Sequence, residues 1–280
     1  MLEVNQEQSQ DLPRQNAKGH SQIAAFFDID NTIMRGTSIY HLARGLFAKG
    51  VLKPRDLTDY AITQGKFLFT GKENSSDLAK VANNALAFVQ NRTVEELASL
   101  AEEIYDEIMS DKLWPGTVRL AAAHREVGHQ VWVVSAAPIE LAQIIASKLN
   151  LTGAVATVSE IVDGRYTGNL ESAPMHGEQK AQAVRNLAQK HDIDLAQSFA
   201  YSDSQNDIPL LSLVGKPRVV NPDSRLRDFA LVNEWPVYDF RREHLKQKYA
   251  VPAARSALLL IGAGAGLALA ARARSRSKIS

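Results

Sequence analysis

The chain has 280 residues, of which 45% are apolar, and a net charge of +1 at pH 7. This length allows one large core or a core domain with a smaller companion. The near-neutral charge gives no field that would steer the chain toward nucleic acid, and the absence of cysteine excludes disulfides, thiolate metal sites and cysteine nucleophiles.

Residues 1–20 are polar and lack the apolar core of a secretory signal. We predict a disordered leader there and expect the folded part to work in the cytosol.

Four short strand candidates follow, of which the first two are continuous apolar runs typical of buried parallel strands, and polar residues come after each of the four. They are residues 23–27, 131–134, 197–201 and 218–220. Segments with helical periodicity lie between them, at 117–127, 139–149 and 179–191. Alternating strands and helices predict an α/β fold, a Rossmann-like three-layer parallel sheet with helices on both faces. We assign this core to residues 21–33 and 112–240.

Two insertions interrupt the core pattern. Residues 34–111 look wholly helical and predict a helical cap over the strand ends, with Pro115 and Gly116 at the return to the core. Residues 154–170 carry Asp163-Gly164 between two alternating runs, which predicts a hairpin flap.

The C-terminal part, residues 241–280, reads as a basic linker and a hydrophobic tail helix. Residues 256–271 are sixteen residues without a charge, flanked by arginines. A helix of this length covers about 24 Å, less than a hydrocarbon core of about 30 Å, so it predicts either a short transmembrane helix or an interfacial anchor. Gly262 and Gly266 have a spacing typical of helix contacts in membranes. The alternative is a helix buried in a core or in an oligomer contact.

Acidic residues gather where the apolar runs end. Asp28 and Asp30 alternate after the first run, and Asp203 and Asp207 follow the third. The carboxyl ends of parallel strands meet at one edge of a sheet, so these carboxylates are expected to converge. A single aspartate near a turn is usually a helix cap. Four that converge repel one another and favour a hard divalent cation, best Mg²⁺ with phosphate and water as further ligands.

These segments resemble the haloacid dehalogenase superfamily, in its phosphoserine-phosphatase-like branch, subfamily IB. The resemblance covers about residues 23–240 and rests on four motifs: DIDNT, VVSAAP, Lys180 and YSDSQND. It implies a phosphoric monoester hydrolase, with the helical insertion as a type-1 cap.

The resemblance also implies roles for individual residues. Asp28 would be the nucleophile that forms an aspartyl phosphate, and Asp30 the general acid and then the general base. Lys180 would neutralise charge on Asp28 and the phosphate, although a surface lysine is the ordinary alternative. Asp203 and Asp207 would hold Mg²⁺ with Asp28 and the main-chain carbonyl of Asp30. The expected substrate contacts are Thr32 and Ser135 to the phosphoryl oxygens, Asn206 as a support of the phosphate loop, and Arg35 nearby.

The substrate is expected to be a small phosphorylated metabolite. Phosphoserine phosphatases carry an acidic residue nine positions after the nucleophile, where this chain has the uncharged Thr37. Histidinol phosphate and a lipid or headgroup phosphate are therefore alternatives, and the apolar tail favours the lipid. A phosphotransferase and a non-catalytic regulator that binds a phosphorylated ligand are hypotheses of other classes.

Overall fold

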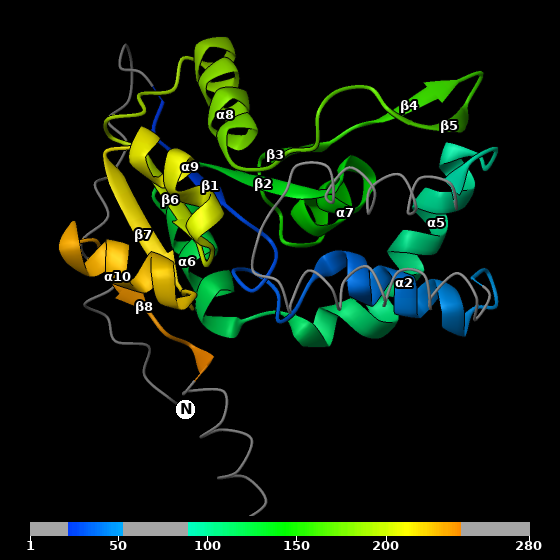
Figure 1. Cartoon of the computed structure of the whole chain (residues 1–280), viewed down its shortest axis with the longest axis horizontal. Coiled ribbons are helices and arrows are strands. Elements are labelled where there is room, and N and C mark those ends of the chain that lie inside the picture. Colours follow the sequence, from blue (N-terminus) through cyan, green and yellow to red (C-terminus); the bar gives the residue numbers. More distant parts are fainter. Residues whose placement is uncertain (1–21, 53–88, 242–280) are drawn as a thin grey trace, which may run out of the picture. The chain divides into compact units, whose positions relative to one another are not determined.

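The computed structural model describes residues 22–52 and 89–241 (Figure 1). Its core is a six-stranded sheet in the order β3-β2-β1-β6-β7-β8, and every neighbouring pair of strands is parallel. The strands are β1 Ala24–Phe27, β2 Gln130–Pro138, β3 Gly153–Thr157, β6 Phe199–Ser202, β7 Lys216–Val220 and β8 Val237–Tyr238. All four predicted strands are therefore present.

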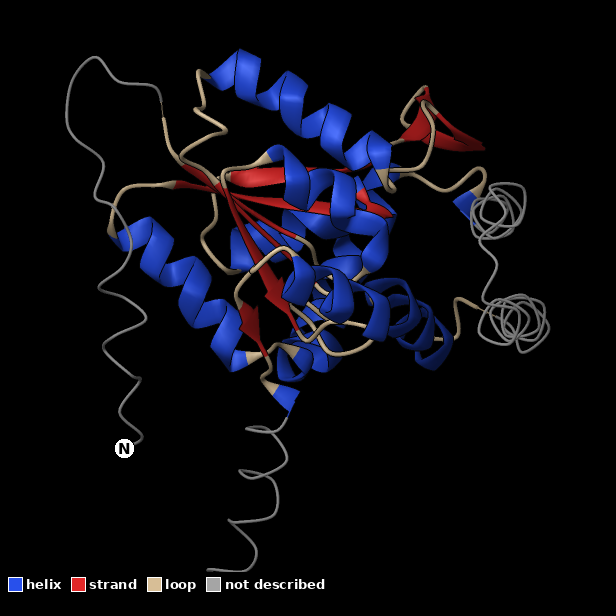
Figure 2. Ribbon diagram, turned by 60° about the vertical axis from the view of Figure 1, so that its left-hand side comes forward, coloured by secondary structure: helices blue, strands red, loops and turns tan. Residues whose placement is uncertain are grey.

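Helices cover both faces of this sheet (Figure 2). They are α6 Pro115–Glu126, α7 Ile139–Lys148, α8 Glu178–His191, α9 Ile208–Leu213 and α10 Ser224–Val232. On one face, Phe26 of β1 belongs to the same buried cluster as Val184 of α8 and Leu210 of α9. On the other face, Phe27 contacts the ring of His124 on α6. The alternation along β1 thus produces the predicted three-layer core.

The predicted flap is wrong in its first third. Gly153–Thr157 form β3, an edge strand parallel to β2. Only β4 Ser159–Val162 and β5 Arg165–Leu170 make the antiparallel hairpin, joined at Asp163-Gly164. The strand was hidden because its sequence, GAVAT, is short and made of small residues. Its first residue must be small, since a Cβ on Gly153 would lie 2.7 Å from Cζ3 of Trp132.

The predicted cap is described in part. It contains α2 Ser38–Ala48 and α5 Val94–Ile104, followed by a π-helical turn, Tyr105–Met109, and a 3₁₀ turn, Ser110–Lys112. The segment is not wholly helical, because Met34 forms β-bridges to Asp30 and Leu113 before α2 begins. Residues 53–88 lie outside the described residues, so the extent of the cap stays a prediction.

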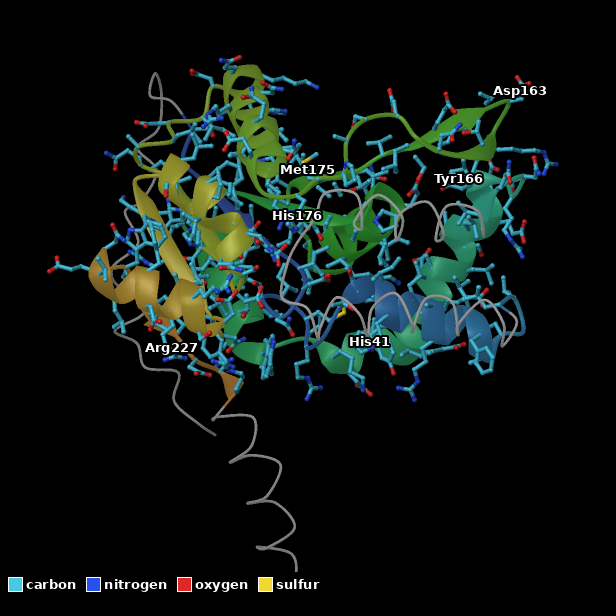
Figure 3. All side chains as sticks on the ribbon, viewed as in Figure 1. His41, Asp163, Tyr166, Met175, His176 and Arg227 are labelled. Carbon is cyan, nitrogen blue, oxygen red and sulfur yellow. The ribbon has the colours of Figure 1, made fainter. Side chains whose placement is uncertain are left out.

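The segment before α5 pairs with the hairpin. The amide of Asn91 donates to the carbonyl of Tyr166 at 2.8 Å, and the amide of Tyr166 donates to the carbonyl of Arg92 at 3.1 Å. The amide of Val94 donates to the carbonyl of Gly164 at 3.1 Å. Figure 3 shows Tyr166 beside the start of α5. Hydrogen bonds between main-chain groups therefore join the described end of the cap to the flap.

The leader, residues 1–20, and the apolar tail, residues 256–271, lie outside the described residues. Within residues 22–52 and 89–241, no helix has both the length and the hydrophobicity needed to cross a bilayer.

Candidate active site

The carboxyl edge of the sheet carries most of the predicted site residues. Asp28 follows the last residue of β1, Asp203 follows β6, and Ser135 lies within β2. Asp207 ends the 3₁₀ turn η3, Gln205–Asp207, and Lys180 lies in the first turn of α8. Because β1, β2 and β6 are parallel neighbours, their ends bring these residues to one edge.

Lys180 joins two of the carboxylates. Its Nζ donates to Oδ1 of Asp28 at 2.6 Å and to Oδ2 of Asp207 at 2.8 Å. The three side chains are at most 7% exposed. The hydroxyl of Ser202 donates a further bond to Oδ2 of Asp207, at 2.7 Å. A buried ion pair needs such additional partners to offset the loss of water around its charges.

One lysine does not balance the carboxylates around it. Burial raises the pKa of Asp28 to about 7, and the charges of Asp207 and Asp30 add to this, while Lys180 acts in the opposite direction. The pKa of Asp203 rises to about 8 through burial and through the charges of Asp28 and Asp207. The ionised forms of Asp28 and Asp203 are therefore disfavoured unless a further positive charge is present.

Asp30 lies between this cluster and α2. Its Oδ1 accepts a hydrogen bond from the amide of Ser38, the first residue of α2, at 2.8 Å. Burial raises the pKa of Asp30, and the bonds from Ser38 oppose that rise. A carboxyl group that holds its proton more readily than usual is suited to give it to a leaving group.

Two predicted hydroxyls are buried at the same edge. Thr32 is fully buried, and among the described residues its Oγ1 has no hydrogen-bond partner. The hydroxyl of Ser135 is also buried and accepts a bond from the amide of Ala137 at 3.1 Å. A buried hydroxyl without a partner costs stability. An oxygen-rich ligand would satisfy Thr32.

Arg35 and Asn206 are less central. The guanidinium of Arg35 donates to the main-chain oxygens of Asp111 and Lys112 and lies 5.8 Å from the centre of the Trp114 ring. The structure thus places Arg35 against the end of the predicted cap rather than among the carboxylates. Asn206 is in η3, where its main-chain N–H donates to the hydroxyl of Ser204 at 3.3 Å.

The sequence did not single out several residues that contact the site. Ser202 binds Asp207, and Asn221 binds the main chain next to Asp30. His41, placed on α2 in Figure 3, is buried and donates from Nε2 to the carbonyl of Arg35 at 2.7 Å. Of these residues, Ser202 lies within the YSDSQND motif, but no pattern assigned a role to any of them. Their contacts depend on turn geometry that no residue pattern announces.

The donor set fits magnesium. In the described part of the chain, no group of three or more His, Cys, Asp or Glu side chains is arranged so that it could hold a metal ion. The carboxylates that surround Lys180 are nevertheless hard oxygen donors with unbalanced negative charge. Mg²⁺ typically binds through one or two carboxylates and completes its octahedron with water and phosphate. The residues present suit such a shared site.

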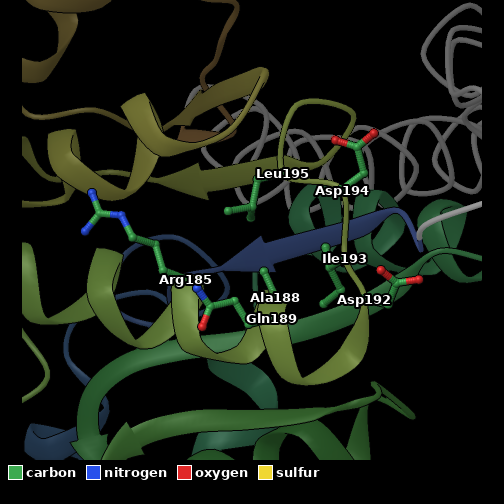
Figure 4. Close-up of a pocket in the computed structure, with 7 residues that line it drawn as sticks. All are labelled: Arg185, Ala188, Gln189, Asp192, Ile193, Asp194 and Leu195. Atoms are coloured by element: carbon green, nitrogen blue, oxygen red, sulfur yellow. The ribbon is translucent and has the colours of Figure 1, made fainter.

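A cavity of about 450 Å³ lies elsewhere, at the end of α8 and before β6 (Figure 4). Its lining includes Arg185, Ile193 and Asp194. These residues precede β6, so the cavity is at the amino edge of the sheet, and none of the predicted site residues lines it.

Comparisons with known proteins identify relatives across most of the chain. Residues 25–212 match the family model for haloacid dehalogenase-like hydrolases. The phosphoserine phosphatase SerB1 of Mycobacterium tuberculosis is 49% identical over 231 residues, which cover 82% of this chain and 75% of the relative.

Solved structures show the same architecture. A protein of unknown function from Bordetella pertussis has a TM-score of 0.70 at 27% identity, and the match covers 79% of this chain and 99% of that one. A phosphoserine phosphatase with an analogue of the phospho-aspartyl intermediate has a TM-score of 0.56 at 20% identity, covering 81% and 99%. This second likeness concerns the fold alone.

Proposed function

Because the chain belongs to the haloacid dehalogenase-like hydrolases, we propose that it is a magnesium-dependent phosphatase that hydrolyses phosphate monoesters through an aspartyl phosphate on Asp28. The observation that supports this most is the buried lysine that joins Asp28 and Asp207. A carboxylate held by a lysine at the carboxyl end of a parallel strand has the place and the partner that a nucleophile needs.

The first half of the reaction uses both aspartates of the first loop. An oxygen of Asp28 attacks phosphorus, and the bond between phosphorus and the ester oxygen breaks. Asp30 gives its proton to the leaving oxygen, which departs as an alcohol. The raised pKa of Asp30 suits it to carry that proton.

The second half regenerates the enzyme. Asp30, now ionised, takes a proton from a water molecule as the water attacks phosphorus. The bond between Asp28 and phosphorus breaks, and inorganic phosphate leaves. Throughout, Lys180 holds Asp28 in place, and the hydroxyls of Thr32 and Ser135 donate to the phosphoryl oxygens.

Asp28, Asp203 and Asp207 would hold Mg²⁺, with the main-chain carbonyl of Asp30. When bound, the ion neutralises charge on the phosphate oxygens. The raised pKa values of Asp28 and Asp203 support this assignment, because a cation beside them would return both to the ionised form.

The proposed substrate is a small phosphorylated metabolite of the phosphoserine type, as the name of the relative from Mycobacterium tuberculosis suggests. Thr37 is exposed at the start of α2 and brings no charge to bind an ammonium group. Histidinol phosphate and a lysophosphatidate are therefore the alternatives to be compared.

The test is release of inorganic phosphate by the purified full-length protein. With Mg²⁺ we expect turnover of L-phosphoserine, measured beside histidinol phosphate and lysophosphatidate at equal concentration. EDTA and, separately, Asp28→Asn should each abolish the release. Preferred turnover of another ester would support the phosphatase mechanism and change the assigned substrate. Equal phosphate release by wild type and Asp28→Asn would refute the mechanism.

We propose separately that residues 256–271 attach the enzyme to a membrane surface from the cytosolic side. Its support is the uncharged run between arginines. Co-sedimentation of the full chain with vesicles of anionic lipid would test it, and an equal amount of protein in the supernatant with and without vesicles would contradict it.

A further inference from the structure

The turn after β7 contacts the loop that carries Asp28 and Asp30. Asn221 is 3% exposed, and its Nδ2 donates to the main-chain oxygen of Asn31 at 3.0 Å. Asn31 directly follows Asp30, and its turn is closed by two further bonds with Gly36. Asn221 therefore fixes the main chain beside Asp30 from another strand.

The same turn contacts the loop that carries Asp203 and Asp207. The amide of Asp223 donates to the carbonyl of Asp203 at 2.8 Å. One carboxylate oxygen, Oδ2, accepts from the amide of Gln205 at 2.8 Å, and the other, Oδ1, caps α10 by accepting from the amide of Leu226 at 2.7 Å. Asp223 thus holds the second acidic loop at two points.

The sheet alone does not connect these loops to β7 in this way. β6 lies between β1 and β7, so no strand pairing joins β7 to the loop after β1. Asn221 reaches across that gap with a side chain, while Asp223 binds the loop of the intervening strand. Two residues of one turn therefore bind both acidic loops.

We propose that Asn221 and Asp223 are positioning residues that set the spacing between the two pairs of aspartates, and thereby the affinity of the site for a divalent cation. This inference rests on the proposed function, since the aspartates matter as metal ligands only if that function holds. Replacing a residue that orients metal ligands through hydrogen bonds generally changes metal affinity by about 10-fold to 100-fold.

Two variants of unchanged size separate this role from packing. In Asn221→Asp, a carboxylate oxygen replaces the donor and faces the carbonyl of Asn31, which repels it. In Asp223→Asn, the remaining oxygen still caps α10, because asparagine caps helices as well as aspartate does. The side-chain NH2 group of the new asparagine then faces the main-chain N–H of Gln205, so two donors oppose each other. Asn221→Ser, which removes the amide without adding charge, serves if Asn221→Asp does not fold.

The chain offers a matched control for each variant. Asn233→Asp makes the same change where Nδ2 donates to the carbonyl of Phe229 at 2.8 Å on the exposed end of α10. Asp194→Asn makes the other change at the amino edge of the sheet, where Oδ1 accepts from the amide of Ala196 at 2.8 Å.

The measurement is Mn²⁺ binding to the full-length protein, followed by electron paramagnetic resonance of the free ion. Melting temperature and the Mg²⁺ dependence of phosphate release are measured beside it. We expect both variants to raise the dissociation constant for Mn²⁺ by about tenfold, with a smaller fall in kcat at saturating Mg²⁺. The two controls should keep the wild-type constant.

The outcomes distinguish this inference from the proposed function. If wild type binds Mn²⁺ and releases phosphate while both variants match their controls, the positioning role is overturned and the phosphatase stands. A fall in melting temperature alone, without a change in the Mn²⁺ constant, also overturns it. If wild type neither binds Mn²⁺ nor releases phosphate, both proposals are overturned.

Discussion

At the scale of single residues, Lys180 is the fixed positive charge of the site. Burial alone would lower its pKa, but the carboxylates of Asp207 and Asp28 outweigh that effect and raise it. Lys180 therefore stays charged over the whole working range of pH. It gives Asp28 a constant partner, unlike a metal ion that exchanges with solvent.

Replacing this lysine should damage both catalysis and folding. Lys180→Met keeps the apolar stem but leaves two buried carboxylates without their partner. We expect kcat to fall by about 10²-fold to 10³-fold and the free energy of unfolding to fall by about 3 kcal/mol. Phosphate release at saturating Mg²⁺ and urea denaturation measure the two effects.

The control for this variant is Lys216→Met. Nζ of Lys216 donates to Oε1 of Gln197 at 3.2 Å, before β6 and away from the carboxylates. It should leave kcat unchanged. A Lys180→Met enzyme with wild-type kcat would show that Asp28 does not need this charge.

Residue types predicted the acidic cluster better than its contacts. Asp28 and Asp207 converge as their positions after parallel strands suggested, because such strands share one carboxyl edge. The place of Lys180 beside them was implied only by the resemblance, since its position at the start of a helix is ordinary for a surface lysine. Arg35 does not join them, since its long side chain finds main-chain oxygens and an aromatic ring nearby. The direction of such a side chain is decided by its neighbours in space, which the sequence does not order.

At the scale of elements, the glycine before α8 positions Lys180. Gly177 has φ of 55° and is the N-cap of α8, and its carbonyl accepts from the amide of Lys180 at 3.1 Å. A residue with a side chain adopts positive φ only at a cost. The first turn of α8, and with it the lysine, starts from a conformation that favours glycine.

Gly177→Ala should therefore affect activity more than stability. The added Cβ would meet only the carbonyl of Asn206, at 3.6 Å, so strain rather than collision is expected. We expect a loss of about 1 kcal/mol in the free energy of unfolding. The displaced start of α8 should lower kcat by about tenfold, because small misplacements of catalytic groups are costly.

Gly164→Ala is the matched control. Gly164 has φ of 73°, and its added Cβ would meet nothing within 4 Å, at the tip of the hairpin. It should lose similar stability in denaturation and keep its kcat. Equal loss of kcat in both variants would mean that general loosening, not the position of Lys180, limits the reaction.

The four central strands of the sheet were predicted, and the two edge strands were missed. β1 and β2 were visible because buried parallel strands need several apolar residues in sequence. β3 and the two-residue β8 gave no such run, since one edge strand is made of small residues and the other is very short. The pairing of the segment before α5 with β5 joins residues about 75 positions apart, for which periodicity carries no information.

At the scale of the whole molecule, the site exists only when the sheet is complete. Asp28 and Lys180 are 152 positions apart, and Asp28 and Asp207 come from the loops of two paired strands. The repulsion among the carboxylates is therefore felt by the folded state and relieved on unfolding. Global stability should report the charge state of the site.

The raised pKa values decide whether stability rises or falls with pH. Asp28 and Asp203 have a usual pKa of 3.8, raised in the folded protein to about 7 and about 8. Between pH 3.8 and about pH 8 the folded state binds more protons than the unfolded state, so the stability of the metal-free protein falls as pH rises. Buried His124 acts oppositely at lower pH, because its pKa falls from 6.5 to about 3. The carboxylate effect is thus separated from that of His124 between about pH 6.5 and 8.

In EDTA, the melting temperature of wild type should fall from pH 6.5 to pH 8, and Mg²⁺ should raise it most at pH 8, where the carboxyls have lost their protons. Asp203→Asn removes one of the two titrating groups, so its melting temperature should depend less on pH in EDTA and respond less to Mg²⁺. Calorimetry in buffers of matched ionic strength measures both. If wild type instead becomes more stable toward pH 8 in EDTA, while Asp203→Asn behaves identically, the carboxylates are not under the mutual repulsion that a bound cation would relieve.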